Sequence, residues 1–246
     1  AQLGISGTRL GDLNGDGCEE FAVGELRRRV NDQNDSGAVR IIFGWGGAGC
    51  PGAAQSVLIS PARPGEQFGG SLALLRPSPD ENGWLVAGAF RHRRYDDNRR
   101  TGGAYLISLD WILEQTQRPA TNDNAPIVVI PRDEAMQVIE GMTNESAFGA
   151  AVATSGSLLV VGEQYGVFGE IRSVGGAWLY RMEDSAPAEV GRVVGETQHP
   201  GDRVGHALSL GGDPLRLIVG GFQGRGIGTE GGSAYLFDVD DLATAP

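Results

Sequence analysis

The chain has 246 residues, 40% of them hydrophobic, so it can bury a core and is neither a disordered chain nor a miniprotein held together only by disulfides. It carries 20 basic and 31 acidic residues, a formal net charge of -11, which disfavours nucleic acid or an anionic membrane as the partner of the whole chain. Forty glycines without a collagen-like period indicate many tight turns between short strands, and therefore an all-β fold.

One pattern recurs four times along the chain. Each copy opens with an apolar residue and Gly, continues to an apolar run ending in Gly, crosses a polar loop, and closes on a small residue, Ala and an apolar strand. The four openings are Leu3-Gly4, Phe68-Gly69, Phe148-Gly149 and Val204-Gly205. Their spacing is irregular because loops of different length are inserted around a constant set of strands.

A fourth strand is predicted to follow the first three copies, over 55–60, 136–140 and 189–194. Repeated groups of four short antiparallel strands are typical of a β-propeller, so we predict a single propeller domain or partial propeller over 1–246. Its blades span approximately 1–62, 63–142, 143–198 and 199–246. A sandwich is the alternative, but it does not require the same glycine-bounded motif at equivalent places.

These motifs resemble the FG-GAP repeats of the integrin α-subunit propeller and of many bacterial surface proteins. The resemblance rests on the Phe-Gly openings of the second and third copies and on the run 11–17, which leads into Phe21-Ala22-Val23-Gly24-Glu25. It covers nearly the whole chain. The sequence departs from it where the Ala-Pro after the second motif is missing throughout, and where the fourth copy opens with Val.

An acidic loop in the first copy has the composition of a calcium site. Asp12, Asn14 and Asp16 place side-chain oxygens at alternate positions of a tight turn, as Ca²⁺ requires. The resemblance to FG-GAP hairpins adds the main-chain carbonyl of Cys18 and the carboxylate of Glu20 as ligands. The other three hairpins lack this pattern, so one structural Ca²⁺ is predicted; the alternative is an Asx-rich turn that holds no ion.

The two cysteines and the start of the chain bear on localisation. Cys18 and Cys50 lie in one blade and can pair if the chain is exported, and otherwise they are two small unpaired hydrophobes. No apolar run approaches the ~20 residues of a membrane helix. Ala1-Gln2 fits a mature terminus after cleavage of a signal peptide. We expect an extracellular, periplasmic or cell-surface protein.

The loops that join the second and third strands of each copy are expected to share the face opposite the acidic loop. They carry half of the arginines: Arg27, Arg28, Arg29, Arg91, Arg93, Arg94, Arg99, Arg100, Arg172 and Arg225. Tyr95, Tyr165 and Phe168 in the same loops either anchor a partner or pack the loops down. By resemblance to integrin propellers, this face takes a protein partner or an acidic glycan, with arginine supplying bidentate contacts. The alternative is that these arginines pair with Asp96, Asp97 and other nearby acids.

Catalysis has little support in the sequence. There is no Gly-x-Ser-x-Gly, Walker or His-Glu-x-x-His motif, and the only histidines are His92, His199 and His206. His206 falls on a predicted inner strand, where a satisfied core residue is expected, and His92 falls in a basic loop. We therefore predict a non-enzymatic binding or adhesion module, or an accessory subunit of a larger assembly. The alternatives are a glycan-binding, lectin-like propeller and the propeller part of a polysaccharide-acting enzyme.

The last blade lacks a predicted outer strand, because only about nine residues follow its third strand and none precede the first motif. An exposed strand edge invites pairing with another chain. Three interpretations stay open: a fragment of a larger propeller, a four-bladed ring closed without strand exchange, and a half-ring completed by another subunit.

Overall fold

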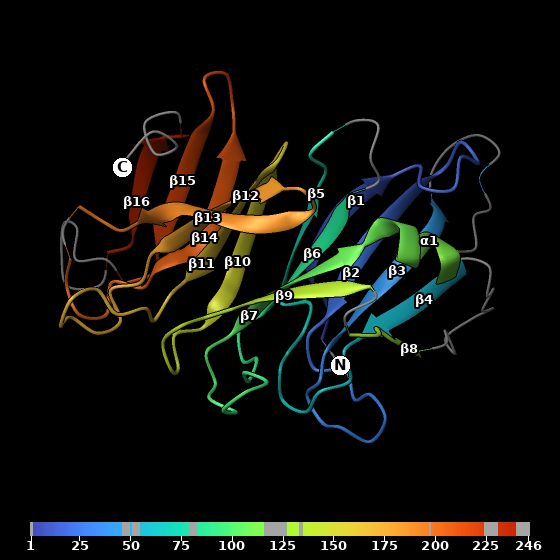
Figure 1. Cartoon of the computed structure of the whole chain (residues 1–246), viewed down its shortest axis with the longest axis horizontal. Helices are drawn as coiled ribbons and strands as arrows, with labels where there is room; N and C mark the ends of the chain where they lie inside the picture. Colours follow the sequence, from blue (N-terminus) through green and yellow to red (C-terminus); the bar gives the residue numbers. More distant parts are fainter. Residues whose placement is uncertain are drawn as a thin grey trace.

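Short apolar runs bounded by glycine form nearly all of the regular structure. The computed structural model describes residues 2–45, 50, 55–78, 83–115, 127–132, 135–196, 198–223 and 231–239. Within these residues the chain forms sixteen strands and one short helix, arranged as four sheets that follow one another along the sequence (Figure 1). The prediction of an all-β fold is confirmed.

The first sheet is a meander of four antiparallel strands with a fifth strand added at its outer edge. The strands are β1 (Leu3–Gly11), β2 (Glu19–Glu25), β3 (Ala38–Trp45) and β4 (Gln55–Ser60). The fifth, β8 (Ile127–Val129), comes from a later part of the chain and pairs with β4 in parallel.

The second sheet contains β5 (Ser71–Leu75), β6 (Trp84–Ala89), β7 (Gly103–Ser108) and β9 (Met136–Glu140). The helix α1 (Leu109–Gln115) follows β7 directly and buries Leu109 and Ile112 in the core shared with the first sheet. Both α1 and β8 lie in the insertion between the third and fourth strands of this copy.

The third sheet is a plain four-stranded meander of β10 (Phe148–Ser155), β11 (Leu158–Glu163), β12 (Ala177–Glu183) and β13 (Ala186–Val193). The fourth has three strands within the described residues: β14 (Val204–Gly211), β15 (Arg216–Gly221) and β16 (Ser233–Asp238). Residues 240–246, which follow β16, lie outside the described part of the chain.

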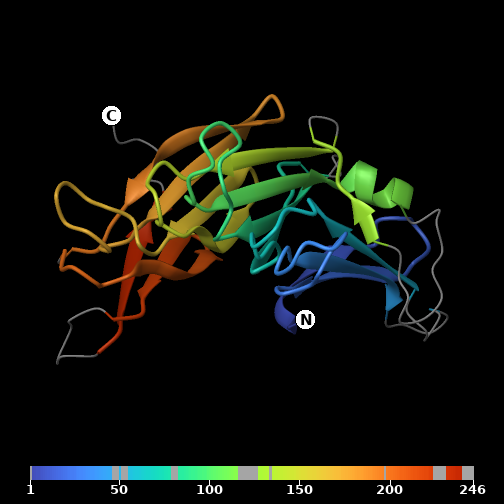
Figure 2. The same ribbon diagram turned by 90° about the horizontal axis from the view of Figure 1, so that it is seen from below.

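The sheets stack through three apolar clusters, each shared by two neighbours. The first cluster joins Ile41 of the first sheet to Leu85 of the second, the next joins Val86 to Leu159, and the last joins Val160 to Leu217. The first and fourth sheets lie at the two ends of an arc (Figure 2). Within the described residues this arc does not close into a ring.

The same backbone contact links each sheet to the next. Gly37 forms a parallel bridge with Phe68, Gly102 with Phe148, and Gly175 with Val204. All three glycines have a positive φ of 78° to 83°, and a Cβ on any of them would lie 2.1 to 2.2 Å from a backbone oxygen of the next sheet. Only glycine satisfies both conditions, so the recurring Gly before the third strand is a requirement of sheet stacking.

Candidate functional site

The loops between second and third strands gather at one end of the sheets, and the turn of the acidic hairpin lies at the other (Figure 1). Backbone hydrogen bonds join neighbouring loops into one surface. The amide of Gln67 donates to Asp35, that of Arg91 to Glu66, and that of Tyr165 to Ser146. We call this surface the loop face and define it by residues 26–36, 61–69, 90–101, 142–147, 164–174 and 199–203.

Most arginines of the loop face are paired with acids nearby. Arg29 contacts Asp32 at 2.8 Å and Arg94 contacts Asp96 at 2.7 Å; Arg99 pairs with Asp97 and Arg100 with Glu145. Hydrogen bonding to Arg94 lowers the pKa of the Asp96 carboxyl below its usual range. Arg93 donates to the carbonyl of Asn98 at 3.1 Å. These contacts hold the loops in place, and the charges of the paired arginines are neutralised by their own neighbours.

No ion pair is seen within the described residues for three other arginines of this face, Arg27, Arg91 and Arg172. Arg225, the remaining arginine predicted here, lies outside the described residues. Two acids at the starts of these loops, Glu25 and Glu163, are buried and are paired with Arg40 at 2.7 Å and Arg192 at 3.3 Å. Glu25 also contacts Arg28 of the loop face at 3.4 Å, so it reduces the positive charge of that surface.

Two hollows meet on the loop face and share Glu145 and Tyr165. The first, about 350 Å³, is also lined by Asn144, Val167, Arg172 and Ser173. The second, about 220 Å³, is also lined by Phe90, Arg91, Arg100 and Ala147. We call the pair the loop trough. It lies between loops of the second and third sheets, and the guanidinium of Arg203 covers the Tyr165 ring at 5.0 Å from its centroid.

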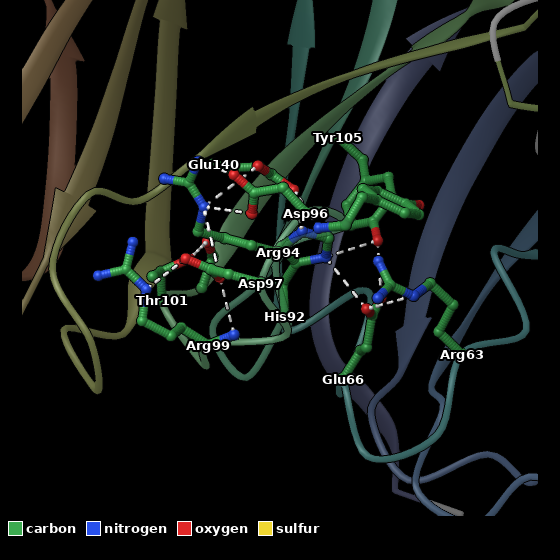
Figure 3. Close-up of polar contacts among 12 residues, drawn as sticks. Arg63, Glu66, His92, Arg94, Asp96, Asp97, Arg99, Thr101, Tyr105 and Glu140 are labelled. Atoms are coloured by element: carbon green, nitrogen blue, oxygen red, sulfur yellow. Dashed lines mark hydrogen bonds and ion pairs between the residues drawn. The ribbon is translucent and has the colours of Figure 1, made fainter.

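A buried polar network lies under the loops of the second sheet (Figure 3). The hydroxyl of Tyr105 donates to Glu66 Oε2 at 2.6 Å, and Nδ1 of His92 lies 2.9 Å from the same hydroxyl. Nε2 of His92 lies 3.0 Å from Glu140 Oε1, while Arg63 contacts Glu66 Oε1 at 3.0 Å. The side chain of His92 has no exposed surface.

Each ring nitrogen of His92 faces oxygen atoms of its neighbours, and Nδ1 also lies 3.0 Å from Glu66 Oε1. Since the Tyr105 hydroxyl donates to Glu66, its free lone pair faces Nδ1, and Nε2 faces the carboxylate of Glu140. Burial raises the pKa of the Tyr105 phenol well above its usual value, and the charge of Glu66 raises it further. His92, Glu66 and Tyr105 are buried, whereas Glu140 and Arg63 are partly exposed, and the network joins the loops of the second sheet to its strands.

Tyr95 connects this network to a third hollow, of about 510 Å³. Its ring is sandwiched between the guanidinium groups of Arg63, 3.9 Å from the ring centroid, and Arg132, 3.8 Å from it. Its amide donates to Glu140 at 3.1 Å. The hollow is lined by Tyr95, Asp96, Arg132, Met136, Gln137, Val138 and Glu140. Because both faces of the Tyr95 ring are covered, the ring packs the loop and offers no free stacking surface, which is the second of the two roles expected for it.

The acidic hairpin is a turn closed by its own carboxylates. Asp12 accepts hydrogen bonds from the amides of Gly15 at 2.8 Å, Asp16 at 3.1 Å and Gly17 at 2.9 Å. Asp16 accepts one from the amide of Cys18 at 2.8 Å. These Asx-type bonds fix the side-chain oxygens around the turn without the help of an ion.

Glu20 is the buried member of this group. It has no exposed surface, and its carboxylate accepts the amide of Leu13 at 2.6 Å and that of Gly44 at 3.4 Å. Burial raises the pKa of Glu20, and the charges of Asp16 and Asp12 raise it further, while the two amide hydrogen bonds lower it. Oxygen atoms are the ligands that a hard cation such as Ca²⁺ prefers, so these groups have suitable chemistry, and a cation among them would reduce the repulsion.

Within the described residues, no group of three or more His, Cys, Asp or Glu side chains is placed to hold a metal. A site here would therefore depend on Asn14 and main-chain oxygens as well as on the carboxylates. Next to the turn, Cys18 and Cys50 form a disulfide with a Cα–Cα distance of 5.8 Å, which ties the hairpin to the segment after β3.

The prediction for His206 is wrong: expected to be a core residue, it is exposed on β14 and contacts Gln164 through Nδ1 at 3.0 Å. His92 lies in the basic loop after β6, as expected, and its side chain is buried there. The sequence analysis did not identify Glu66, Tyr105 and Glu140 as partners of His92. The available signal was His92 itself, whose loop leads back to the strand β7 that carries Tyr105.

Comparison with known proteins identifies no relative: no protein-family model matches the sequence, and no curated protein matches it. The described residues include no helix of the length and apolar character needed to cross a membrane.

Proposed function

We propose that this chain is a non-catalytic binding protein whose four sheets are FG-GAP-type propeller blades and whose loop face takes an acidic protein partner. The proposal of blades is supported by the bridge between the Gly before each third strand and the opening residue of the next sheet, which recurs at all three junctions. Residues of the FG-GAP-like motif thus form the contact between sheets, as expected of a motif that defines a stacking unit.

The observation that carries the binding proposal is the loop trough. Tyr165 lines both hollows, Arg91 and Arg100 line one of them, and Arg172 lines the other. Arg100 is already paired with Glu145, which leaves Arg91 and Arg172 to meet a ligand. A guanidinium group binds a carboxylate through two parallel hydrogen bonds, so two separated arginines fit a partner that presents two acidic side chains.

A protein partner suits this trough better than a small molecule. The hollows are shallow and lie between loops from two sheets, whereas small-molecule sites are enclosed and mostly apolar. Arginine and tyrosine are the residues most often found at the energetic centre of protein interfaces. We further propose that one Ca²⁺ at Asp12, Asn14, Asp16, Cys18 and Glu20 stabilises the first blade, and that the protein works outside the cytoplasm, where its disulfide persists.

The binding proposal is tested with an octaglutamate peptide as the probe, measured by calorimetry at low and moderate salt. We expect salt-sensitive binding, because the contact is between charged groups near the surface. The double variant Arg91→Ser/Arg172→Ser should weaken it by about tenfold or more, since each lost charge-assisted contact contributes roughly 1.5 to 3 kcal/mol.

Arg181→Ser is the matched control, because Arg181 lies on β12 next to the turn at the opposite end of the third sheet and its loss changes the charge in the same sense. It should bind as the unmodified chain does. Equal binding by the loop-face variant and by this control contradicts the proposal. If polygalacturonate binds more tightly than octaglutamate, and the same double variant loses this binding, the ligand is an acidic glycan and not a protein.

A further inference from the structure

The two end sheets differ from the two middle sheets in how they are buried. All six residues of β11, in the third sheet, are buried, whereas exposed or half-buried residues alternate along β16 in the fourth. In the first sheet, β1 is exposed over its first three residues. Within the described part of the chain, each end sheet therefore has one face covered by a neighbour and one face open.

The open face of the fourth sheet carries residues that are core residues elsewhere. Ile218 pairs with Leu236 across β15 and β16, in the register that pairs Val86 with Leu106 and Val160 with Leu179. The pairs in the second and third sheets are at most 2% exposed because the next sheet covers them. Ile218 is 46% exposed and Leu236 is 60% exposed.

The open face of the first sheet carries the residues that, in each later sheet, contact the preceding sheet. Leu3 occupies the position of Phe68, Phe148 and Val204, which open the later sheets and are 0 to 1% exposed; Leu3 is 62% exposed. The next residue, Gly4, has a φ of 85°, close to the 83° of Gly69 and the 82° of Gly149. The first sheet is thus shaped to stack on a preceding sheet.

A glycine in the fourth sheet is likewise shaped for a following sheet. Gly24, Gly88 and Gly162 lie at equivalent positions of the second strands, and a Cβ on any of them would meet a backbone oxygen of the next sheet at 2.0 to 2.1 Å. Gly220 is the fourth member of this set, and a Cβ there would meet only Ala207 of its own sheet, at 3.4 Å. The space for a fifth sheet is present at this end.

We propose that the open face of the fourth sheet binds the open face of the first sheet of a second copy of this chain. The interface would continue the sheet-to-sheet contact that the chain already uses three times, with Leu3 and Gly4 of one copy stacking beside Ile218, Gly220 and Leu236 of the other. The two open faces lie at opposite ends of the arc (Figure 2), so two copies form two identical junctions. Head-to-tail contacts of this kind close into a ring when the rotation allows, here a ring of eight sheets, within the range of known propellers.

This inference rests on the stacking contacts and not on the ligand of the loop face, so its failure leaves the binding proposal standing. The test is the mass of the complete chain by light scattering after size exclusion. We expect a particle of about twice the chain mass of 25.8 kDa. A monomer at micromolar concentration, or a particle of any other mass, overturns the proposal.

Charge variants test which faces meet. Leu3→Asp and Leu236→Arg, each alone, should weaken dimerisation by at least tenfold. An equimolar mixture should restore the dimer, because a mixed pair has one unmodified junction and one junction that joins Asp to Arg. Failure of the mixture to restore the dimer, with both variants melting cooperatively, contradicts a head-to-tail contact.

A glycine variant separates loss of the dimer from loss of the fold. Gly220→Ala should keep the cooperative melt of the monomer and abolish the dimer, because the added methyl group fits the isolated fourth sheet but not a stacked junction. Persistence of the dimer in Gly220→Ala overturns the proposal independently of the charge variants.

Discussion

Gly162 and Gly205 meet at the junction of the third and fourth sheets so closely that a Cβ on Gly162 would lie 2.0 Å from the carbonyl oxygen of Gly205. Real Cβ atoms do not approach a backbone oxygen to this distance, so two sheets would have to separate to admit one methyl group.

Gly162→Ala should therefore destabilise the chain by about 3 kcal/mol, at the upper end of the usual cost of overpacking. Urea unfolding followed by circular dichroism measures the change. Gly191→Ala is the control, since Gly191 also lies in a strand but has no atom within 4 Å of the position that an added Cβ would occupy. It should be neutral or slightly stabilising. Similar losses in the two variants would show that sheet stacking is not what requires Gly162.

Reduction of the disulfide should loosen the first sheet. Cys18 and Cys50 are 32 residues apart in sequence. Closing a loop of this length lowers the conformational entropy of the unfolded chain, which stabilises the folded state by about 3 to 4 kcal/mol at 25 °C. Cys18→Ser/Cys50→Ser should show a loss of this order in urea unfolding. An unchanged midpoint in the double variant would show that the acidic hairpin holds the segment after β3 without the bond.

Stability should fall at alkaline pH because two phenols are buried. Burial raises the pKa of Tyr105 and of Tyr180 above the usual value of about 10, so the folded state holds both phenols neutral. Their stabilisation is complete below pH 10 and is lost as pH rises beyond it, because only the unfolded chain releases the protons.

Above pH 10 the free energy of unfolding should fall by about 1.4 kcal/mol per pH unit for each buried phenol. The free energy of unfolding between pH 9 and 11 measures it, and Tyr105→Phe/Tyr180→Phe should flatten the dependence. A double variant that keeps the original slope would assign the alkaline loss to other groups.

Calcium should raise the melting temperature if the acidic hairpin binds it. A ligand present at 100 times its dissociation constant adds about 2.7 kcal/mol, or roughly 5 to 10 °C for a chain of this size. Glu20→Gln should lose most of this shift, because the buried carboxylate is the ligand that the ion would neutralise. Glu183→Gln removes the same charge from an exposed strand end and should keep the shift. Melting that does not respond to calcium or chelator would leave the hairpin as a turn without an ion.

The positions of the first three strands of each sheet could be predicted from the sequence because glycines that stacking requires recur at fixed places in or beside them. β4 and β9 have the predicted bounds, whereas β13 begins at Ala186, before the predicted 189. The reason is a two-residue turn at Asp184 and Ser185, both with positive φ, which pairs Glu183 directly with Ala186. Neither residue is a glycine, so the turn carried no signal.

Contacts between distant parts of the chain could not be predicted in this way. β8 pairs with β4 across the first three strands of the second copy, with Leu58 opposite Ile127, and no local pattern encodes that pairing. The exposure of His206 has a related cause. A residue on an inner strand is buried only where another sheet covers it, and His206 lies on an end sheet.

The three largest apolar clusters of the described residues are each shared by two adjacent sheets. The cooperativity of unfolding should then resemble that of a linear array, in which every unit is held by its nearest neighbours. An end sheet detaches when one interface is lost, whereas a middle sheet detaches only when two are lost. Opening should therefore start at the two termini and move inward, and the loop trough between the second and third sheets should be the last part of the surface to lose its shape.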